Sequence, residues 1–300
     1  MPNMKEIKNH INSVRDTKKI TNAMYLIAST KMRKAKSGLD KTRPYFDAMR
    51  GEIKRIFRRA PYVDSRYFYP ADGKILEGGT YGCLIITSDK GLAGAYNINA
   101  IRAAESLLKK HAKTKLFVVG EYGRQYFSQK KIPIEHSFLY TAQNPTMQRA
   151  REISSILLDM YDSGQVNKIY VVYTDWKNGL TEEATTARLL PFHRNEFMNE
   201  NEKNITTPFE FLNSVEMVLD TMMPSYVSGY IYSALIDSFC CEQNARMTAM
   251  DSANRNAEKI LENLSTQYNR VRQAAITQEI TEVSAGAKAQ RQKKEVAGIE

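Results

Sequence analysis

Two long stretches of the chain carry hydrophobic residues at alternating spacings of three and four, which is the pattern of a coiled coil. No proline lies between Pro2 and Pro44, so the first stretch predicts a helix over residues 3–59, bent near Gly38 or Pro44. Its alternation continues without a slip through Met4, Ile7, Ile11, Val14, Lys18, Thr21, Tyr25, Ala28, Met32, Ala35 and Leu39.

The second stretch covers residues 225–286, where proline is absent and only Gly229 precedes the final Gly286. At about 1.5 Å rise per residue, a helix of this length spans about 90 Å, more than the diameter of an ordinary domain. We expect it to pair antiparallel with the first helix and to extend beyond it as a single helix. Polar residues interrupt its pattern at Gln243, Arg246, Gln267 and Gln278. The expected seam is Met250, Ala253, Ala257, Ile260 and Leu264.

Between these stretches the pattern changes to that of an α/β domain. Short apolar runs predict strands at 81–87, 115–120 and 168–174, a weaker strand at 134–140 and an edge strand at 183–192. Helical patterns occupy 99–111, 121–129 and 146–162, and this alternation indicates βαβ units around a mainly parallel sheet. Residues 195–204 are expected to form a loop. Residues 210–222 are expected to form a short helix that Pro224 stops.

The expected fold class is therefore mixed α/β: a long antiparallel coiled coil of N- and C-terminal helices, with an inserted Rossmann-like α/β domain. The expected divisions are a helix at 1–59, a linker at 60–80, the inserted domain at 81–212, a helix at 213–287 and a tail at 288–300. The linker is rich in proline and glycine. The tail is too polar to pack, so we expect it to be frayed or disordered.

Composition adds a cellular context. The 300 residues are 42% hydrophobic, as in globular proteins. No apolar run approaches the roughly twenty residues that span a bilayer, and the N-terminus resembles neither a signal nor a transit peptide. Cys83, Cys240 and Cys241 lack metal-ligand spacing, and we interpret them as small apolar residues in a reducing compartment. These features favour a cytosolic protein without direct membrane insertion.

The net charge of +10 is concentrated near the N-terminus, where the first sixty residues hold sixteen Lys and Arg against five Asp and Glu. A helix this basic is typical of proteins that face nucleic acid, a membrane surface or an acidic protein. The plainer alternative is a solvated helix face. A coiled-coil protein that binds nucleic acid should interleave aromatic or glycine residues with the basic ones, and residues 1–60 offer few of them.

The most enzyme-like segment is Ser88–Asn97, SDKGLAGAYN, a glycine-bearing loop between a predicted strand and helix. Rossmann-type folds bind phosphate at this position. However, the chain contains no GxGxxG motif and no P-loop, so a tight connection built on Gly91 and Gly94 is the favoured interpretation. A Rossmann-like enzyme with helical arms is the alternative. We predict no catalytic residue, cofactor or metal site, because the four histidines are scattered: His10, His111, His136 and His193.

Three further segments carry a family resemblance: ITNAMYLIASTKMRKA at 20–35, EQNARMTAMDSANRNA at 242–257 and YNRVRQAAITQEITEVSAGA at 268–287. Together with SDKGLAGAYN, they resemble the gamma subunit of bacterial-type F-type ATP synthases over residues 3–287. The resemblance implies a non-catalytic central rotor shaft that couples ion flow through the membrane sector to rotary conformational change at the catalytic ring. It also implies three partners: the hexameric ring of alpha and beta subunits, the epsilon subunit and the ring of c subunits. The implied location is the cytoplasmic side of the bacterial cell membrane, as a peripheral part of the complex.

The resemblance also assigns roles to single residues. It implies that the shaft tip sits in an apolar collar through Ile276, Ile280, Val283 and Ala287. It implies contacts with the catalytic ring through Met24, Arg272, Gln273, Thr277 and Glu282. From its spacing alone, Arg272 would be interpreted as a solvated helix charge, so only the resemblance assigns it a contact.

Overall fold

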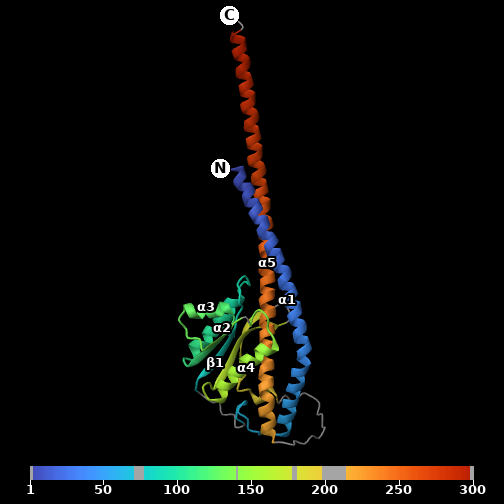
Figure 1. Ribbon diagram of the computed structural model, residues 1–300, viewed down its shortest axis with the longest axis vertical. Coiled ribbons are helices and arrows are strands. Elements are labelled where there is room, and N and C mark those ends of the chain that lie inside the picture. Colours follow the sequence, from blue (N-terminus) through green and yellow to red (C-terminus); the bar gives the residue numbers. More distant parts are fainter. Residues whose placement is uncertain (1–2, 71–77, 140, 178–180, 198–213, 298–300) are drawn as a thin grey trace. The chain divides into compact units, whose positions relative to one another are not determined.

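The computed structural model describes residues 3–70, 78–139, 141–177, 181–197 and 214–297. It divides into two compact units, one formed by Ile27–Thr248 and the other by Met1–Leu26 with Ala249–Glu300. Two long helices, α1 (Met4–Arg59) and α5 (Val215–Ala297), contribute residues to both units (Figure 1).

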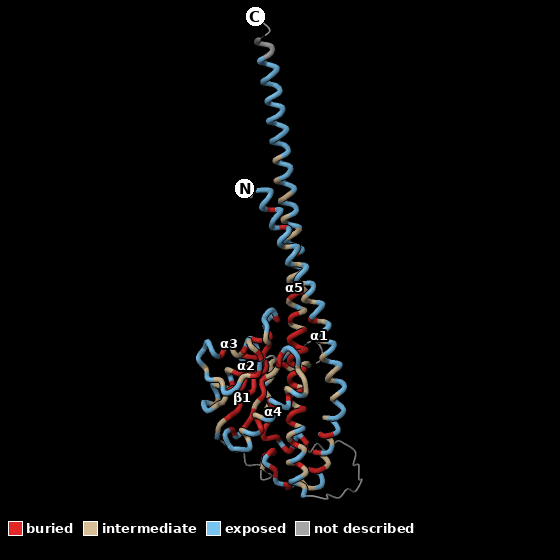
Figure 2. The backbone as a smooth tube through the Cα atoms, viewed as in Figure 1, coloured by how far each residue is buried: buried red, intermediate tan, exposed pale blue. Residues whose placement is uncertain are grey.

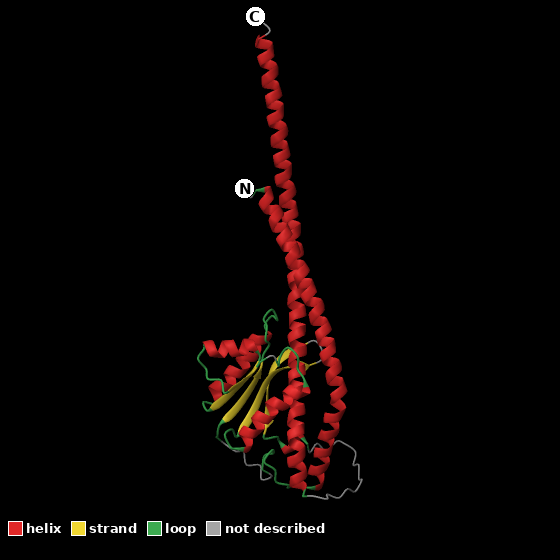
Figure 3. Cartoon of the chain, in the orientation of Figure 1, coloured by secondary structure: helices red, strands yellow, loops and turns green. Residues whose placement is uncertain are grey.

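The unit of residues 27–248 is built on a five-stranded sheet with the order β3-β2-β1-β4-β5 (Figure 3). Its strands are β1 (Tyr81–Ile86), β2 (Thr114–Val119), β3 (His136–Phe138), β4 (Lys168–Lys177) and β5 (Thr181–Leu190). Strands β1 to β4 are parallel, whereas β5 is antiparallel to β4. The predicted mainly parallel sheet with an additional edge strand is therefore confirmed.

Helices cover both faces of this sheet. Helices α2 (Tyr96–Lys110) and α3 (Glu121–Gln129) pack on the face that carries Cys83 and Ile85. Helix α4 (Met147–Asp162) and the parts of α1 and α5 in this unit pack on the face that carries Leu84 and Ile86. Successive strand residues point to opposite faces, so a continuous apolar strand such as β1 serves both cores. A short 3₁₀ helix, η1 (Arg194–Glu196), follows β5. It falls where a loop was expected, and residues 198–204 of that loop lie outside the described residues.

Pro224 does not stop a helix, so the prediction of a separate short helix before it was wrong. Helix α5 begins at Val215 and continues through Pro224, while residues 210–213 lie outside the described part of the chain. An interior proline costs a helix about 3 kcal/mol. Four fully buried residues on the same stretch offset this cost by packing in the core: Leu219, Met223, Val227 and Ile231.

Part of the predicted linker also belongs to the core, which corrects its interpretation as a connection only. Val63, Tyr67, Phe68 and Tyr69 are buried. The Tyr69 amide donates to the Phe192 carbonyl at 3.1 Å, and the Phe192 amide donates to the Tyr67 carbonyl at 2.8 Å. Aromatic burial and backbone pairing thus tie this segment to the end of β5. Residues 71–77 lie outside the described chain.

Within the same unit, α1 and α5 run antiparallel and approach each other closely at Gly229. A Cβ atom at this position would overlap the ring of Phe46, so a larger residue could not keep this approach. The three cysteines of the chain are free and buried, as their interpretation as small apolar residues requires. In Figure 2, the buried segments of this unit lie on the strands of the sheet and on the part of α5 beside them.

The second unit is an antiparallel coiled coil of the N-terminal part of α1 and the C-terminal part of α5. Ile7 and Ile11 are buried on α1, and Met250 and Ala257 are buried on α5. The Lys18 Nζ atom lies 2.6 Å from the Glu258 Oε1 atom, and the Thr21 hydroxyl forms a hydrogen bond with the Asn254 side-chain oxygen. The order of these pairs along the two helices confirms the antiparallel arrangement.

The α5 side of the seam differs from the prediction at two positions. Ile260 is 43% exposed, whereas Leu261 is half-buried. The seam follows Met250, Asn254, Ala257, Leu261 and Leu264, and Ala253 lies beside it. Both this register and the predicted one keep a three-four alternation and share three members, so spacing alone could not separate them. The Thr21–Asn254 pair decides the register by satisfying both polar groups.

The predicted end of α5 was also too early. The helix continues to Ala297, and every side chain from Ile276 to Lys293 is exposed. The segment after Ala287 is rich in strong helix formers, Ala, Lys, Arg and Gln, and helix propagation needs no tertiary packing. None of the helices in the described residues contains a stretch apolar enough to cross a membrane.

We expect Gly120→Ala to lower the free energy of unfolding by more than about 3 kcal/mol. Gly120 precedes α3 with φ +94, and an added Cβ would overlap the Thr87 carbonyl group. Gly164 has φ +74 but open space around it, so Gly164→Ala should cost only about 1–2 kcal/mol for its backbone conformation. Urea unfolding of both variants checks this. Equal losses of unfolding free energy in the two variants would show that the close approach of Gly120 to the Thr87 carbonyl does not affect stability.

Candidate functional site

The carboxyl ends of β1 and β4 mark the point where the strand order reverses. Helices α2 and α3 lead the chain from β1 towards β2 and β3, whereas β4 lies on the other side of β1. Open α/β sheets bind their ligands in the crevice at such a point. In this chain α5 occupies the crevice: the Thr174 amide donates to the Ser238 hydroxyl at 3.1 Å, and Ala93 and Tyr96 pack against Cys241.

The loop after β1 is closed by its own hydrogen bonds. The Ser88 amide donates to the Asn97 Oδ1 atom at 2.9 Å, and the Asn97 Nδ2 atom donates to the Ser88 hydroxyl at 2.7 Å. The Ser88 hydroxyl also donates to the Lys90 carbonyl at 2.7 Å. These bonds join the two ends of the loop to each other and hold it closed. This geometry agrees with the interpretation of Ser88–Asn97 as a tight connection.

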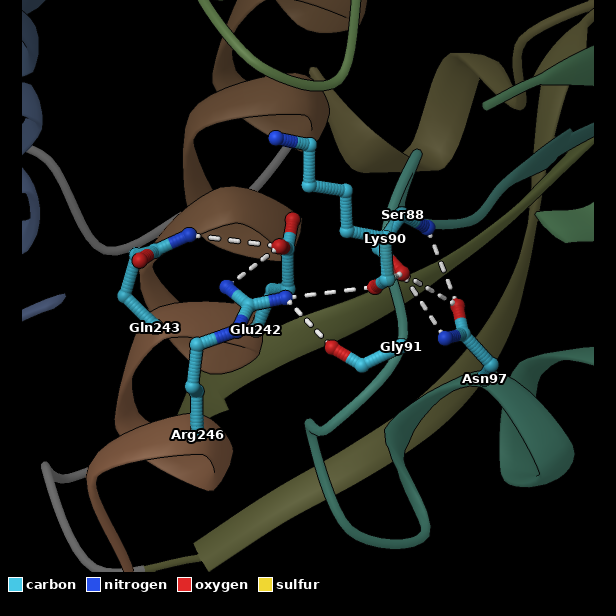
Figure 4. Close-up of polar contacts among 7 residues, drawn as sticks. All are labelled: Ser88, Lys90, Gly91, Asn97, Glu242, Gln243 and Arg246. Atoms are coloured by element: carbon cyan, nitrogen blue, oxygen red, sulfur yellow. Dashed lines mark hydrogen bonds and ion pairs between the residues drawn. The ribbon is translucent and has the colours of Figure 1, made fainter. Parts of the chain in front are cut away.

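Helix α5 holds this loop through a buried network that we call the α5 clasp, formed by Glu242, Gln243, Arg246 and the carbonyls of Lys90 and Gly91 (Figure 4). The Arg246 NH2 atom donates to the Lys90 carbonyl at 3.2 Å and to the Gly91 carbonyl at 3.1 Å. Its NH1 atom lies 2.7 Å from the Glu242 Oε1 atom, which also accepts from Gln243 Nε2 at 3.2 Å. The α5 clasp therefore fixes the β1–α2 loop to one turn of α5.

Two carboxyl groups on this part of α5 are desolvated. Burial raises the pKa of Glu242 to about 6, although its partner Arg246 opposes the shift. Burial also raises the pKa of Asp237 to about 6, and the neighbouring charge of Asp175 adds to this shift. In both cases the folded chain binds protons more tightly than the unfolded chain does. Both groups therefore lower the free energy of unfolding as pH rises towards and above 6.

We expect Asp237→Asn to raise the free energy of unfolding by about 2–3 kcal/mol at pH 7.5. The pKa of Asp237 rises from 3.8 to about 6 on folding, so ionisation disfavours the folded state above that range. Near pH 4 the carboxyl is protonated in the folded chain, and the gain should fall below about 1 kcal/mol. Urea unfolding at the two pH values measures the difference. A gain that does not depend on pH would contradict the raised pKa.

The collar residues expected from the sequence are exposed. Ile276, Ile280 and Val283 are 47%, 61% and 72% exposed. At about 100° per residue, they share with Ala287 a strip of the helix about 60° wide. We call these four residues the tip stripe.

The polar residues expected beside the tip stripe do not all share one face. Arg272 and Gln273 flank the stripe on its two edges, with Thr277 next to Gln273, and all three are exposed. Glu282 lies about 180° around the helix from Gln273, so α5 does not bring these two together. Met24, on α1, is half-buried.

Sequence reasoning missed the α5 clasp. Gln243 and Arg246 were interpreted as polar interruptions of a coiled-coil seam, whereas they are 3% and 9% exposed and face the loop after β1. A local signal was available: Glu242 and Arg246 are four apart, the spacing of an ion pair on a helix. In the described residues, no group of three or more His, Cys, Asp or Glu side chains could hold a metal ion.

The comparisons with known proteins agree on one family. A family model described as ATP synthase matches residues 3–290. The ATP synthase gamma chain of Caldanaerobacter subterraneus is 42% identical over 292 residues, covering 94% of this chain and 98% of that protein. The sodium ion specific ATP synthase gamma chain of Acetobacterium woodii is 34% identical over 302 residues, covering 96% of this chain and 98% of that protein. A chain in the central stalk and c-ring structure of Tetrahymena thermophila mitochondrial ATP synthase has a similar fold, with a TM-score of 0.58 and 24% sequence identity. The match covers 78% of this chain and 99% of the Tetrahymena chain. The chain therefore belongs to the ATP synthase gamma chains.

Proposed function

We propose that this chain is the central rotor shaft of an F-type ATP synthase, without catalytic activity of its own. The observation that carries the proposal is α5, a single helix from Val215 to Ala297. Its residues 242–246 hold the α/β domain through the α5 clasp, and its residues 276–293 expose every side chain. Such a helix can receive torque at one part and present a surface to surrounding subunits at another.

In this proposal residues 1–59 and 213–287 form the shaft and residues 81–212 form the domain at its foot. The tip stripe turns within an apolar collar of the alpha and beta ring. Met24, Arg272, Gln273, Thr277 and Glu282 contact the catalytic ring. The epsilon subunit and the c-ring bind the foot, on the cytoplasmic side of the bacterial membrane. Exposed ion pairs contribute only about 0–1 kcal/mol each, so charged contacts on the shaft would not trap it at one angle.

The filled crevice at β1 and β4 supports a non-catalytic role, because α5 occupies the place where related sheets bind ligands. We expect the isolated chain to show no ATPase activity and no tight nucleotide binding. Calorimetric titration with ATP tests this expectation. Micromolar binding accompanied by turnover would contradict the shaft proposal.

We expect Arg272→Ala to lower steady-state ATP turnover of the assembled complex by about tenfold, because a hydrogen bond to a charged group contributes about 1.5–3 kcal/mol. The stability of the isolated chain should change by less than about 0.5 kcal/mol, since Arg272 is exposed. Arg270→Ala is the matched control, because Arg270 is exposed on the same helix but faces about 160° away. Equal turnover of the Arg272→Ala and wild-type complexes would show that Arg272 is only solvated surface.

A further inference from the structure

A cavity of about 430 Å³ lies between α1, α5 and the end of β4, within the unit of residues 27–248. Sites that bind small organic molecules have volumes of about 300–1,000 Å³. The cavity is separate from the α5 clasp and from the tip stripe. No step of the proposed shaft function uses it.

The inner wall of the cavity carries two carboxylates, Asp175 from β4 and Asp237 from α5. Both side chains are half-buried, and they lie close enough for the charge of Asp175 to act on Asp237. Neither makes a hydrogen bond or an ion pair within the described part of the chain. Two half-buried like charges repel each other, and a cation placed between them would offset this repulsion and donate hydrogen bonds to both carboxylates.

Aromatic side chains form another part of the wall. Phe46 of α1, Trp176 of β4 and Tyr230 of α5 line the same cavity. Aromatic faces attract cations and also pack against apolar groups. Carboxylates combined with aromatic rings are the chemistry that recognises an ammonium or guanidinium group on an apolar stem.

Asp175 and Asp237 are half-buried, whereas four basic residues of α1 that also line the cavity are all exposed: Arg33, Lys36, Arg43 and Arg50. The charge of Arg43 opposes the rise in the pKa of Asp237, but the Arg43 side chain is 70% exposed and its Nε atom lies 4.0 Å from the Asp47 carboxylate. Its guanidinium therefore remains at the solvent side. Among the charged residues that line the cavity, Asp175 and Asp237 are the two that are not exposed.

We propose that this cavity binds an organic cation: an ammonium or guanidinium group held between Asp175 and Asp237, with its apolar stem against Phe46, Trp176 and Tyr230. The same chemistry serves a free small amine and the basic side chain of a neighbouring subunit. Because α1 and α5 both line the cavity, an occupant would stabilise their packing and raise the Tm of this unit.

Fluorescence of the native chain can test the proposal. Trp176 is the only tryptophan among the 300 residues, so its emission reports on the cavity without a label. The probe is 4-phenylbutylamine at pH 8, and its uncharged analogue is 4-phenylbutan-1-ol. For a molecule of this size we expect saturable binding with a Kd on the order of 1 mM. The alcohol should bind at least about tenfold more weakly, because it carries no charge for the carboxylates.

Two isosteric variants, Asp175→Asn and Asp237→Asn, should each weaken binding of the amine by about tenfold or more. The control is Asp159→Asn, an exposed carboxyl on α4 away from the cavity, which should leave the Kd unchanged. Thermal melts confirm that each variant is folded. Equal binding of the amine and the alcohol, unchanged binding by both cavity variants, or the absence of saturable binding would overturn the proposal.

A second arm identifies the source of the cation. The same titration on the assembled complex should reproduce the Kd of the isolated chain if a free amine occupies the cavity. Loss of amine binding on assembly, with binding to the isolated chain retained, would assign the site to a basic side chain of a neighbouring subunit. Neither outcome depends on rotation, so failure of this proposal is distinguishable from failure of the shaft proposal.

Discussion

Replacing Arg246 with alanine should lower the free energy of unfolding of the 27–248 unit by about 3–5 kcal/mol. The substitution leaves the Glu242 carboxylate, only 6% exposed, without its charged partner and removes the donors to the Lys90 and Gly91 carbonyls. Part of the loss should be recovered at pH 5, because Glu242 can then be protonated. Urea unfolding at pH 5 and 7.5 measures both effects.

Arg255→Ala is the matched control for this prediction. Arg255 pairs with Asp251 on the same helix at the same i,i+4 spacing and at 2.8 Å, but the two side chains are 74% and 46% exposed. Exposed helix pairs of this type contribute about 0.3–0.5 kcal/mol. If Arg246→Ala lowers the free energy of unfolding by no more than Arg255→Ala does, the α5 clasp does not stabilise the fold.

Replacing Ile11 with aspartate should destabilise the coil of residues 1–26 and 249–300 by about 3 kcal/mol or more. Ile11 is 7% exposed in the seam, where an ionised carboxylate would be desolvated among apolar side chains. Hydrogen exchange should show protection of the α1 amides in residues 4–26 falling by about 100-fold or more. The 27–248 unit should keep its protection.

Two controls belong to the same experiment. Ile20→Asp, on the same helix at a side chain that is 61% exposed, should change protection little. On α5, Leu261→Asp should act like Ile11→Asp, whereas Ile260→Asp should act like Ile20→Asp. The opposite result for Ile260 and Leu261 would restore the register expected from spacing and contradict the observed one.

Helices and strands that depend on the pattern of neighbouring residues could be predicted from the sequence. The helix at 3–59 and the strand at 81–87 follow from three-four spacing and from a short apolar run, and both occur within one or two residues of their expected bounds. The continuation of α5 through Pro224 could not be predicted, because it depends on packing against residues distant in sequence. The local cost of a proline inside a helix, considered alone, favoured the end of a helix at Pro224.

The candidate surfaces differ in how far the sequence indicates them. The family resemblance implies the residues of the tip stripe, and their helical spacing within one segment places them on one strip of α5. The α5 clasp was not expected, because Arg246 donates to carbonyls 155 and 156 residues earlier, and backbone carbonyls give no sequence pattern. The seam at Ile260 or Leu261 was undecided by pattern because both positions are apolar and adjacent.

The most direct test of the shaft proposal is to observe rotation. Lys109→Cys places a thiol in the last turn of α2, where Lys109 is exposed, while the native cysteines Cys83, Cys240 and Cys241 are all buried. A bead attached to this thiol, on an assembled complex immobilised through its alpha and beta ring, should turn in one direction while ATP is hydrolysed. It should stop when ATP is removed. A bead that stays still while the same complexes hydrolyse ATP at the full rate would contradict the account.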